Sequence, residues 1–112
     1  MTSIEVDRER NVRLEFTDGV VATFELPALR LACPCAECEA RRTRGDVVSR
    51  AAESDPGSIR IRSAEMAGAF GLSLEWSDGH STGIYGIERM RRWVDRREVV
   101  AHVVRPSGPP ID

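Results

Sequence analysis

The sequence lacks the local motifs that assign many proteins to an enzyme class. It contains no Walker loop, no glycine pattern for nucleotide binding and no serine nucleophile motif. Basic residues are not in excess, because 16 arginine and lysine residues stand against 18 acidic residues for a net charge of −2. This balance argues against a general nucleic-acid-binding protein, which usually carries a basic excess.

Segments that direct proteins to membranes or to export are also missing from the sequence. No apolar run approaches the length of a membrane span. Residues 1–5 lead directly into charged positions and do not resemble a signal peptide. We therefore expect a soluble, cytoplasmic protein that binds neither membrane nor nucleic acid.

Cysteine is scarce, and the three that occur cannot all form disulfides with one another. An odd number argues against the disulfide framework of a small secreted protein. A chain of 112 residues is expected to form one domain with a real but small core. In such a domain a bound metal ion would contribute to folding.

All three cysteines lie within the six-residue segment Cys33–Cys38, in the pattern Cys-x-Cys-x-x-Cys. Cys33 and Cys35 are too close in sequence for a relaxed disulfide, but as thiolates they could share one metal ion. Cys38 lies in a helix expected to begin near Ala36, whose N-terminus would favour the thiolate form. The segment therefore predicts a metal site, and thiolates accept both zinc and iron.

Alternating apolar residues predict paired strands in the first part of the chain. A short strand is expected over 3–7, followed by a hairpin of residues 12–16 and 20–24. A three-residue turn at 17–19, with Gly19 in the left-handed conformation, would place every apolar residue of the hairpin on one face. A two-residue turn would separate them. The residues concerned are Val12, Leu14, Phe16, Val20, Ala22 and Phe24.

The remaining segments complete a small α+β domain. Helices are expected over 27–31, 36–43 and 86–96, and strands over 59–61, 72–76, 80–84 and 99–104. Residues 49–58 are rich in turn-forming residues and predict an exposed loop. We expect one domain over residues 1–105, built from antiparallel β-hairpins, short helices and a Cys3His metal knuckle. Residues 106–112, with three prolines, are expected to form a flexible tail.

One internal repeat points to a fourth metal ligand. The segment Leu14–Val20 matches Leu74–His80 sixty positions later (74 − 14). Convergence on a common Asp-Gly hairpin is the alternative to a true structural repeat. If the repeat is real, His80 replaces an inward-facing Val20, and His102 is the competing histidine ligand. Three thiolates and one imidazole would make a closed tetrahedral site suited to zinc.

Other polar residues near these motifs have simpler expected roles. Asp78 is expected to accept backbone hydrogen bonds in the turn and to do no more. Arg30, Arg41 and Arg42 are close enough in sequence to offset the negative charge of a thiolate site. The arginine-rich stretches 41–44 and 89–97 predict solvated helix faces, with docking to an acidic partner as the alternative. The two tryptophans, Trp76 and Trp93, are expected in the core.

Two motifs in matching order resemble a known family. They are Leu29–Cys38 and Trp76–Tyr85, and the sequence between about residues 12 and 94 is similar to domain of unknown function 971, the gamma-butyrobetaine hydroxylase-like N-terminal domain. The resemblance implies zinc held by Cys33, Cys35, Cys38 and His80, and it favours His80 over His102. In gamma-butyrobetaine and trimethyllysine hydroxylases the domain precedes a 2-oxoglutarate/iron oxygenase domain. A related domain is appended to some Mrp-type P-loop ATPases that carry iron–sulfur clusters.

No oxygenase or ATPase sequence accompanies these motifs, so we do not carry those activities over to the chain. We expect a non-enzymatic zinc-binding domain that acts through an unidentified protein partner. Iron–sulfur cluster handling is the first alternative, because three cysteines can hold a cluster with one other ligand. A thiol redox switch is the second, in which oxidation would pair Cys38 with Cys33 or Cys35.

Overall fold

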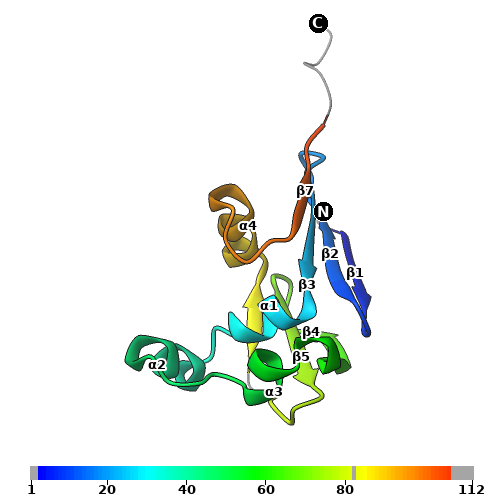
Figure 1. Ribbon diagram of the computed structural model, residues 1–112. Coiled ribbons are helices and arrows are strands. Elements are labelled where there is room, and N and C mark those ends of the chain that lie inside the picture. Colours follow the sequence, from blue (N-terminus) through cyan, green and yellow to red (C-terminus); the bar gives the residue numbers. More distant parts are fainter. Residues whose placement is uncertain (1–2, 82, 107–112) are drawn as a thin grey trace, which may run out of the picture.

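The computed structural model describes residues 3–81 and 83–106 of the chain (Figure 1). Its strands form two antiparallel sheets. The first has the order β1-β2-β3-β7, with β1 at Ser3–Asp7, β2 at Asn11–Glu15, β3 at Val21–Glu25 and β7 at His102–Val104. The second has the order β4-β5-β6, with β4 at Ile61–Met66, β5 at Gly71–Trp76 and β6 at Ile84–Gly86.

Short helices connect and flank the strands. They are α1 at Leu26–Leu31, α2 at Ala36–Arg44, α3 at Arg50–Ser54, the 3-10 helix η1 at Pro56–Ser58 and α4 at Ile87–Arg96. Figure 1 shows α2 at the edge of the molecule, away from both sheets. These elements confirm the expected α+β class. None of the helices in the described part of the chain is long and apolar enough to span a membrane.

The first hairpin has the predicted register. Val12 pairs with Phe24, and the N–H of Phe16 donates to the carbonyl of Val20 at 2.9 Å. Gly19 has a φ of +87°, the left-handed conformation that glycine adopts without steric cost. All six apolar residues of the hairpin are therefore on one face and are buried, as the three-residue turn predicts.

The second hairpin repeats this arrangement. Met66 pairs with Leu72 just as Val6 pairs with Val12, sixty positions earlier (72 − 12). In the turn after β5, the N–H of Trp76 donates to the carbonyl of His80 at 2.8 Å, as in the first turn. Each hairpin then runs into a helix. The internal repeat is therefore structural, and we name β1-β2-β3-α1 copy one and β4-β5-β6-α4 copy two.

The two copies diverge directly after His80. Tyr85 pairs with Leu72, and Ile84 pairs with Ser73. A strict continuation of the repeat would pair Ile84 with Leu72, so copy two contains one extra residue between His80 and Ile84. Our expectation of a return strand over 80–84 that continues the inward alternation is wrong, because a shift of one residue turns each later side chain to the opposite face. Tyr85 is fully buried and Ile84 is 55% exposed.

Aromatic side chains join the two copies in the core. The Trp93 ring on α4 makes edge-to-face contacts with Phe24 of copy one and Tyr85 of copy two, at centroid distances of 6.2 and 6.3 Å. Trp76 packs against Tyr85 in the same way at 6.4 Å. Trp76 is fully buried, as expected, whereas Trp93 is only half-buried. One core therefore serves both copies.

Two predictions of local structure are wrong. Residues 49–58 are not an exposed loop, because they form α3 and η1. The Ser49 hydroxyl caps α3 by accepting the N–H of Ala52 at 3.2 Å, and Ala52 is buried. The last strand, expected over 99–104, is limited to His102–Val104, because Val99 has a φ of +65° that interrupts an extended strand.

Two parts of the predictions fall outside the structure as described. Thr82 of the expected return strand is not among the described residues, and neither are residues 107–112 of the expected tail. Pro106 is described, and its ring lies against Gly19: a Cβ added to Gly19 would lie 2.9 Å from the Pro106 ring.

Candidate metal centre

The three cysteines and His80 converge from two distant parts of the chain. Cys33 and Cys35 lie between α1 and α2, Cys38 lies in the first turn of α2, and His80 ends the turn after β5. The Nε2 atom of His80 is 3.2, 3.4 and 3.5 Å from the Sγ atoms of Cys33, Cys35 and Cys38, respectively. These four ligand atoms all lie within 4.8 Å of one another, a group that could hold a metal ion.

The competing histidine does not join this group. His102 lies on β7, where it pairs with Thr23 of β3 and is exposed. Among the described residues, the cluster that could bind a metal consists of Cys33, Cys35, Cys38 and His80. The structure thus assembles the four predicted residues, and their role as ligands remains a prediction.

The geometry fits a single tetrahedral ion. Typical zinc bonds of about 2.3 Å to sulfur and 2.0–2.1 Å to nitrogen place the nitrogen about 3.5 Å from each sulfur of a regular tetrahedron. The three observed sulfur–nitrogen distances lie between 3.2 and 3.5 Å. Three sulfurs and one imidazole nitrogen are also the donor types of a closed structural site.

Local sequence explains how the cysteine segment folds. Cys35 is the N-cap of α2, and its Sγ accepts the backbone N–H of Cys38 at 3.4 Å. A sulfur replaces the oxygen that usually accepts at this position, so the atom that caps the helix is also a potential metal ligand. The helix ends at Gly45, which has a φ of +78°. Both ends of α2 were predictable from these local signals.

Gly83 allows the hairpin backbone to pass close to the cysteines. A Cβ at this position would lie 2.5 Å from the Sγ of Cys33, closer than atoms tolerate. The residue belongs to the stretch between His80 and Ile84 in which copy two has gained a residue. Sequence reasoning missed Gly83, since a glycine in a return strand has many explanations.

Arg30 reaches the centre from α1, as expected from its place in the sequence. Its side chain is only 4% exposed, and Nη1 donates to the Sγ of Cys38 at 3.6 Å. Arg42 instead binds the main chain, donating to the carbonyls of Leu31 and Cys33 at 2.8 Å each. Arg41 pairs with Glu37 on the surface. Of the three arginines expected to balance the thiolates, Arg30 makes the contact with a ligand sulfur.

Asp78 does more than stabilise its turn, so our expectation for it is incomplete. Its Oδ1 accepts the N–H of His80 at 3.2 Å, which is the predicted turn contact. Its Oδ2 also accepts from Ser49 Oγ at 2.7 Å and from Arg30 Nε at 2.8 Å. Burial alone would raise the pKa of this carboxyl, but the bonds from Ser49 and His80 and the charge of Arg30 hold the pKa below its usual value. An ionised Asp78 therefore ties the His80 turn to α1 and α3.

The Cys33 sulfur is fully buried within the centre. Burial, together with the neighbouring Cys35 and Cys38, raises the pKa of the Cys33 thiol to about 12. Without a cation this thiol stays protonated at neutral pH. A divalent metal ion reverses the preference, because it stabilises the thiolate directly. Cys33 is therefore expected to act as a thiolate ligand only when an ion compensates its charge.

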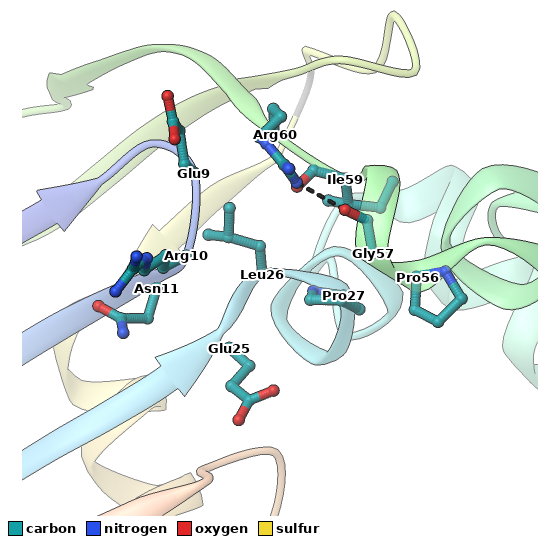
Figure 2. A pocket seen from close by; sticks show the side chains of 10 residues that line it. All are labelled: Glu9, Arg10, Asn11, Glu25, Leu26, Pro27, Pro56, Gly57, Ile59 and Arg60. Atoms are coloured by element: carbon teal, nitrogen blue, oxygen red, sulfur yellow. Dashed lines mark hydrogen bonds between the residues drawn. The ribbon is translucent and has the colours of Figure 1, made fainter.

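Several hollows indent the surface of the described part of the molecule, and two of them differ in their relation to the centre. One, of about 380 Å³, lies beside the centre; its lining includes Arg30, Cys38, Asp78 and His80. Figure 2 shows the other, of about 480 Å³, where the turn after β1, the start of α1 and η1 meet. It is lined by Glu9, Arg10, Asn11, Glu25, Leu26, Pro27, Pro56, Gly57, Ile59 and Arg60. None of these ten residues belongs to the four-residue group, so this hollow is separate from the metal centre.

The fold and the four-residue group define a small α+β domain with a Cys3His set of potential metal ligands. A family model described as gamma-butyrobetaine hydroxylase-like, N-terminal, matches residues 4–91. The chain belongs to this family, and the resemblance inferred from its two motifs is confirmed.

Solved structures share the fold. One is the crystal structure of a protein of unknown function of the DUF971 family from Acidithiobacillus ferrooxidans ATCC 23270. It is 24% identical, with a TM-score of 0.60 over 80% of this chain and 86% of that chain. A second, determined by NMR in solution, is 19% identical, with a TM-score of 0.57 over 85% of this chain and 72% of that chain. No curated protein matches the chain.

Proposed function

We propose that the chain is a non-enzymatic zinc-binding module. The observation that carries the proposal is the position of the His80 imidazole, 3.2–3.5 Å from all three cysteine sulfurs. Four protein ligands complete a tetrahedral zinc ion and leave no open position for a substrate or a catalytic water. The role of the ion would be to join the cysteine segment to the second hairpin.

The packing of α2 supports a structural role for the metal. Cys38 is the buried residue of this helix, and its other positions are mostly charged. A helix of nine residues is marginal in isolation, and in most proteins an apolar face holds such a helix against the core. Here metal–sulfur bonds would replace that apolar face. The proposal therefore makes the position of α2 dependent on the ion.

The compactness of the group favours one ion over an iron–sulfur cluster. All four ligand atoms lie within 4.8 Å of one another, as around a single ion. Ligands on different irons of a cluster lie further apart, because the irons and sulfides separate them. A thiol redox switch is compatible with the zinc proposal, since Cys35 is partly exposed. A reducing compartment such as the cytoplasm would keep the three thiols available for the metal.

A protein partner is part of the proposal, and the surface of copy two supports it. The Phe70 side chain is 76% exposed, and Met66 and Ile84 are 53% and 55% exposed. At the position equivalent to Phe70, copy one carries the charged Arg10. We expect a partner to cover the Phe70 side chain, which is the most exposed of the three.

Metal and sulfide analysis tests the function. Untagged protein would be purified once in air and once without oxygen, and zinc, iron and acid-labile sulfide would be measured per chain. We expect one zinc and no sulfide in both preparations. Iron with sulfide in the anaerobic preparation would overturn the zinc module in favour of a cluster protein. A Cys35→Ser variant prepared in parallel should contain no zinc if the bound ion is at this site.

A further inference from the structure

Two ion pairs connect the copies in a reciprocal way. Arg30 in the helix of copy one pairs with Asp78 in the turn of copy two. Arg91 in the helix of copy two pairs with Asp18 in the turn of copy one. Given the one-residue insertion in copy two, Arg91 is the counterpart of Arg30, just as Asp78 is the counterpart of Asp18. The molecule therefore contains the same contact twice.

The two aspartates have the same role in their turns. The Oδ1 atom of Asp18 accepts the N–H of Val20 at 3.3 Å, as that of Asp78 accepts the N–H of His80 at 3.2 Å. Turn formation therefore does not distinguish the copies. What distinguishes them is the environment of the paired arginine.

The arginines differ in exposure and in what else they touch. The side chains of Arg91 and Asp18 are 27% and 53% exposed, whereas those of Arg30 and Asp78 are 4% and 13% exposed. Besides Asp18, Arg91 contacts Asp95 in a surface pair and lies over the Phe16 ring, 4.8 Å from its centroid. The second contact of Arg30 is the sulfur of Cys38, at 3.6 Å. One guanidinium thus contacts a ligand atom and also holds the turn that carries another ligand.

We propose that Arg30 is a positioning residue of the metal centre, which sets how tightly the ligands hold a divalent ion through Cys38 Sγ and Asp78. The inference rests on the proposed metal site. Three thiolates, a neutral imidazole and a divalent ion sum to a charge of −1, and a buried cation on one sulfur offsets part of it. The ion pair with Asp78 meanwhile fixes the backbone of His80, whose N–H bonds the same carboxylate. A side chain that bonds a metal ligand in this way orients the ligand and tunes its affinity for the metal.

The hollow beside the centre gives the contact a kinetic role. Its lining includes Arg30, Asp78, Cys38 and His80. Solvent therefore reaches the Arg30–Asp78 ion pair next to two of the proposed ligands. Removing the guanidinium would open this side of the centre. Release of the ion to a chelator should therefore become faster, as well as more favourable.

The test compares Arg30→Met with Arg91→Met, which removes the equivalent arginine from the other pair. Zinc affinity would be measured by competition with a chromophoric chelator, and the rate of zinc loss to excess chelator would be followed in the same assay. We expect Arg30→Met to weaken zinc binding by about 10- to 100-fold and to accelerate zinc loss. Arg91→Met should stay within about twofold of the parent, because an exposed ion pair contributes little.

Cobalt supplies a readout that general destabilisation does not move. In the Co²⁺-loaded protein, loss of the Arg30 contact should shift the thiolate-to-cobalt charge-transfer band, while Arg91→Met should leave the band unchanged. Arg30→Lys should recover part of the affinity, since it keeps the charge but loses the planar fork that spans sulfur and carboxylate. An Arg30→Met protein with the parent's affinity and cobalt spectrum would overturn the proposal, as would equal weakening in Arg91→Met.

A second pair of variants covers the case in which Arg30→Met does not fold. Asp78→Asn keeps the side-chain volume and a turn acceptor but removes the charge that holds Arg30, and Asp18→Asn makes the same change in copy one. We expect about tenfold weaker zinc binding for Asp78→Asn alone. If Asp78→Asn bound zinc as tightly as the parent, the contacts of Arg30 with Asp78 and Cys38 would not control zinc affinity. If the parent itself binds no metal, the proposed function fails; if the parent binds metal and these variants match it, only the role of Arg30 fails.

Discussion

The two copies place an apolar side chain and a potential metal ligand at equivalent positions of the same hairpin. Both have the same strand pairing, the same turn hydrogen bonds and a helix that follows directly. In copy one, Val20 is buried among apolar side chains. In copy two, His80 takes that position and meets three sulfurs from a distant segment. At this point the hairpins differ by one substitution and one added residue, and the cysteines that meet His80 come from a segment outside both hairpins.

The largest expected effect comes from removing one of the cysteines that meet His80 of copy two. Cys35→Ser should lose the metal and lower the free energy of unfolding by at least about 4 kcal/mol, the range reserved for loss of a metal or a comparable feature. Metal analysis and thermal unfolding on the same samples measure both. His102→Ala is the control and should keep metal and stability, because this histidine is exposed on β7. Normal stability of a metal-free Cys35→Ser protein would show that the ion is dispensable.

A smaller effect is expected when the histidine is placed in copy one. Val20→His would put an imidazole at the position of His80 without cysteines to meet it, in a site that is 3% exposed. We expect a loss of about 2–4 kcal/mol, since a buried polar group without a partner costs that much. Urea unfolding at constant zinc measures the loss. A variant as stable as the parent would mean that the hairpin position tolerates histidine by itself and that the metal is not required to explain His80.

Gly83 tests the close approach that is special to copy two. Gly83→Ala would place a methyl group against the Cys33 sulfur, and we expect a cost of about 1–3 kcal/mol from overpacking, together with weaker zinc binding. Gly57→Ala is the matched control, because nothing lies within 4 Å of a Cβ added there. Equal behaviour of the two variants in a zinc competition assay would contradict the proposed approach of the hairpin to the sulfur.

The smallest expected effect distinguishes the two ion pairs by salt. Both carboxyls have a pKa below the usual value, Asp18 chiefly through its hydrogen bond with Arg91 and Asp78 against the effect of burial, so both are charged at neutral pH. Each charged carboxylate stabilises the fold above the ordinary carboxyl pKa, and this stabilisation is lost as the pH falls through the lowered pKa.

In 1 M salt, Asp18→Asn should change the Tm by less than about 1 °C, because exposed charges are screened. Asp78→Asn should lower the Tm of the zinc-loaded protein at low and high salt alike. If high salt removed this decrease in Tm, the Arg30–Asp78 ion pair would be exposed to solvent.

Much of the fold followed from local chemistry. A left-handed Gly19 and the pattern of six apolar residues were sufficient to predict the register of the first hairpin without any tertiary contact. The cysteine spacing predicted the metal group, and the repeat led to His80, since an inward valine in one copy marked the same position in the other. Each of these predictions depended on residues close in sequence or on a comparison within the chain.

The parts that could not be predicted depend on contacts between distant segments. The extra residue after His80 has no sequence signature, yet it decides that Tyr85 and not Ile84 enters the core. The carboxylate of Asp78 meets Ser49 and Arg30 only once the two copies have packed together. Asp18 and Asp78 occupy equivalent turn positions in the sequence. Only the folded structure shows that Asp78 contacts the arginine beside the cysteines.

The ring contacts of Trp93 provide a built-in optical probe. This side chain touches Phe24 of one copy and Tyr85 of the other, so its fluorescence depends on whether the copies are docked. Trp76 is on β5, and its ring contact is with Tyr85 of the same copy, so its emission would report on the packing of that hairpin. Single-tryptophan proteins, made by Trp76→Phe or Trp93→Phe, would therefore reveal the order of events during refolding: closure of one hairpin from one emission signal, and association of the halves from the other.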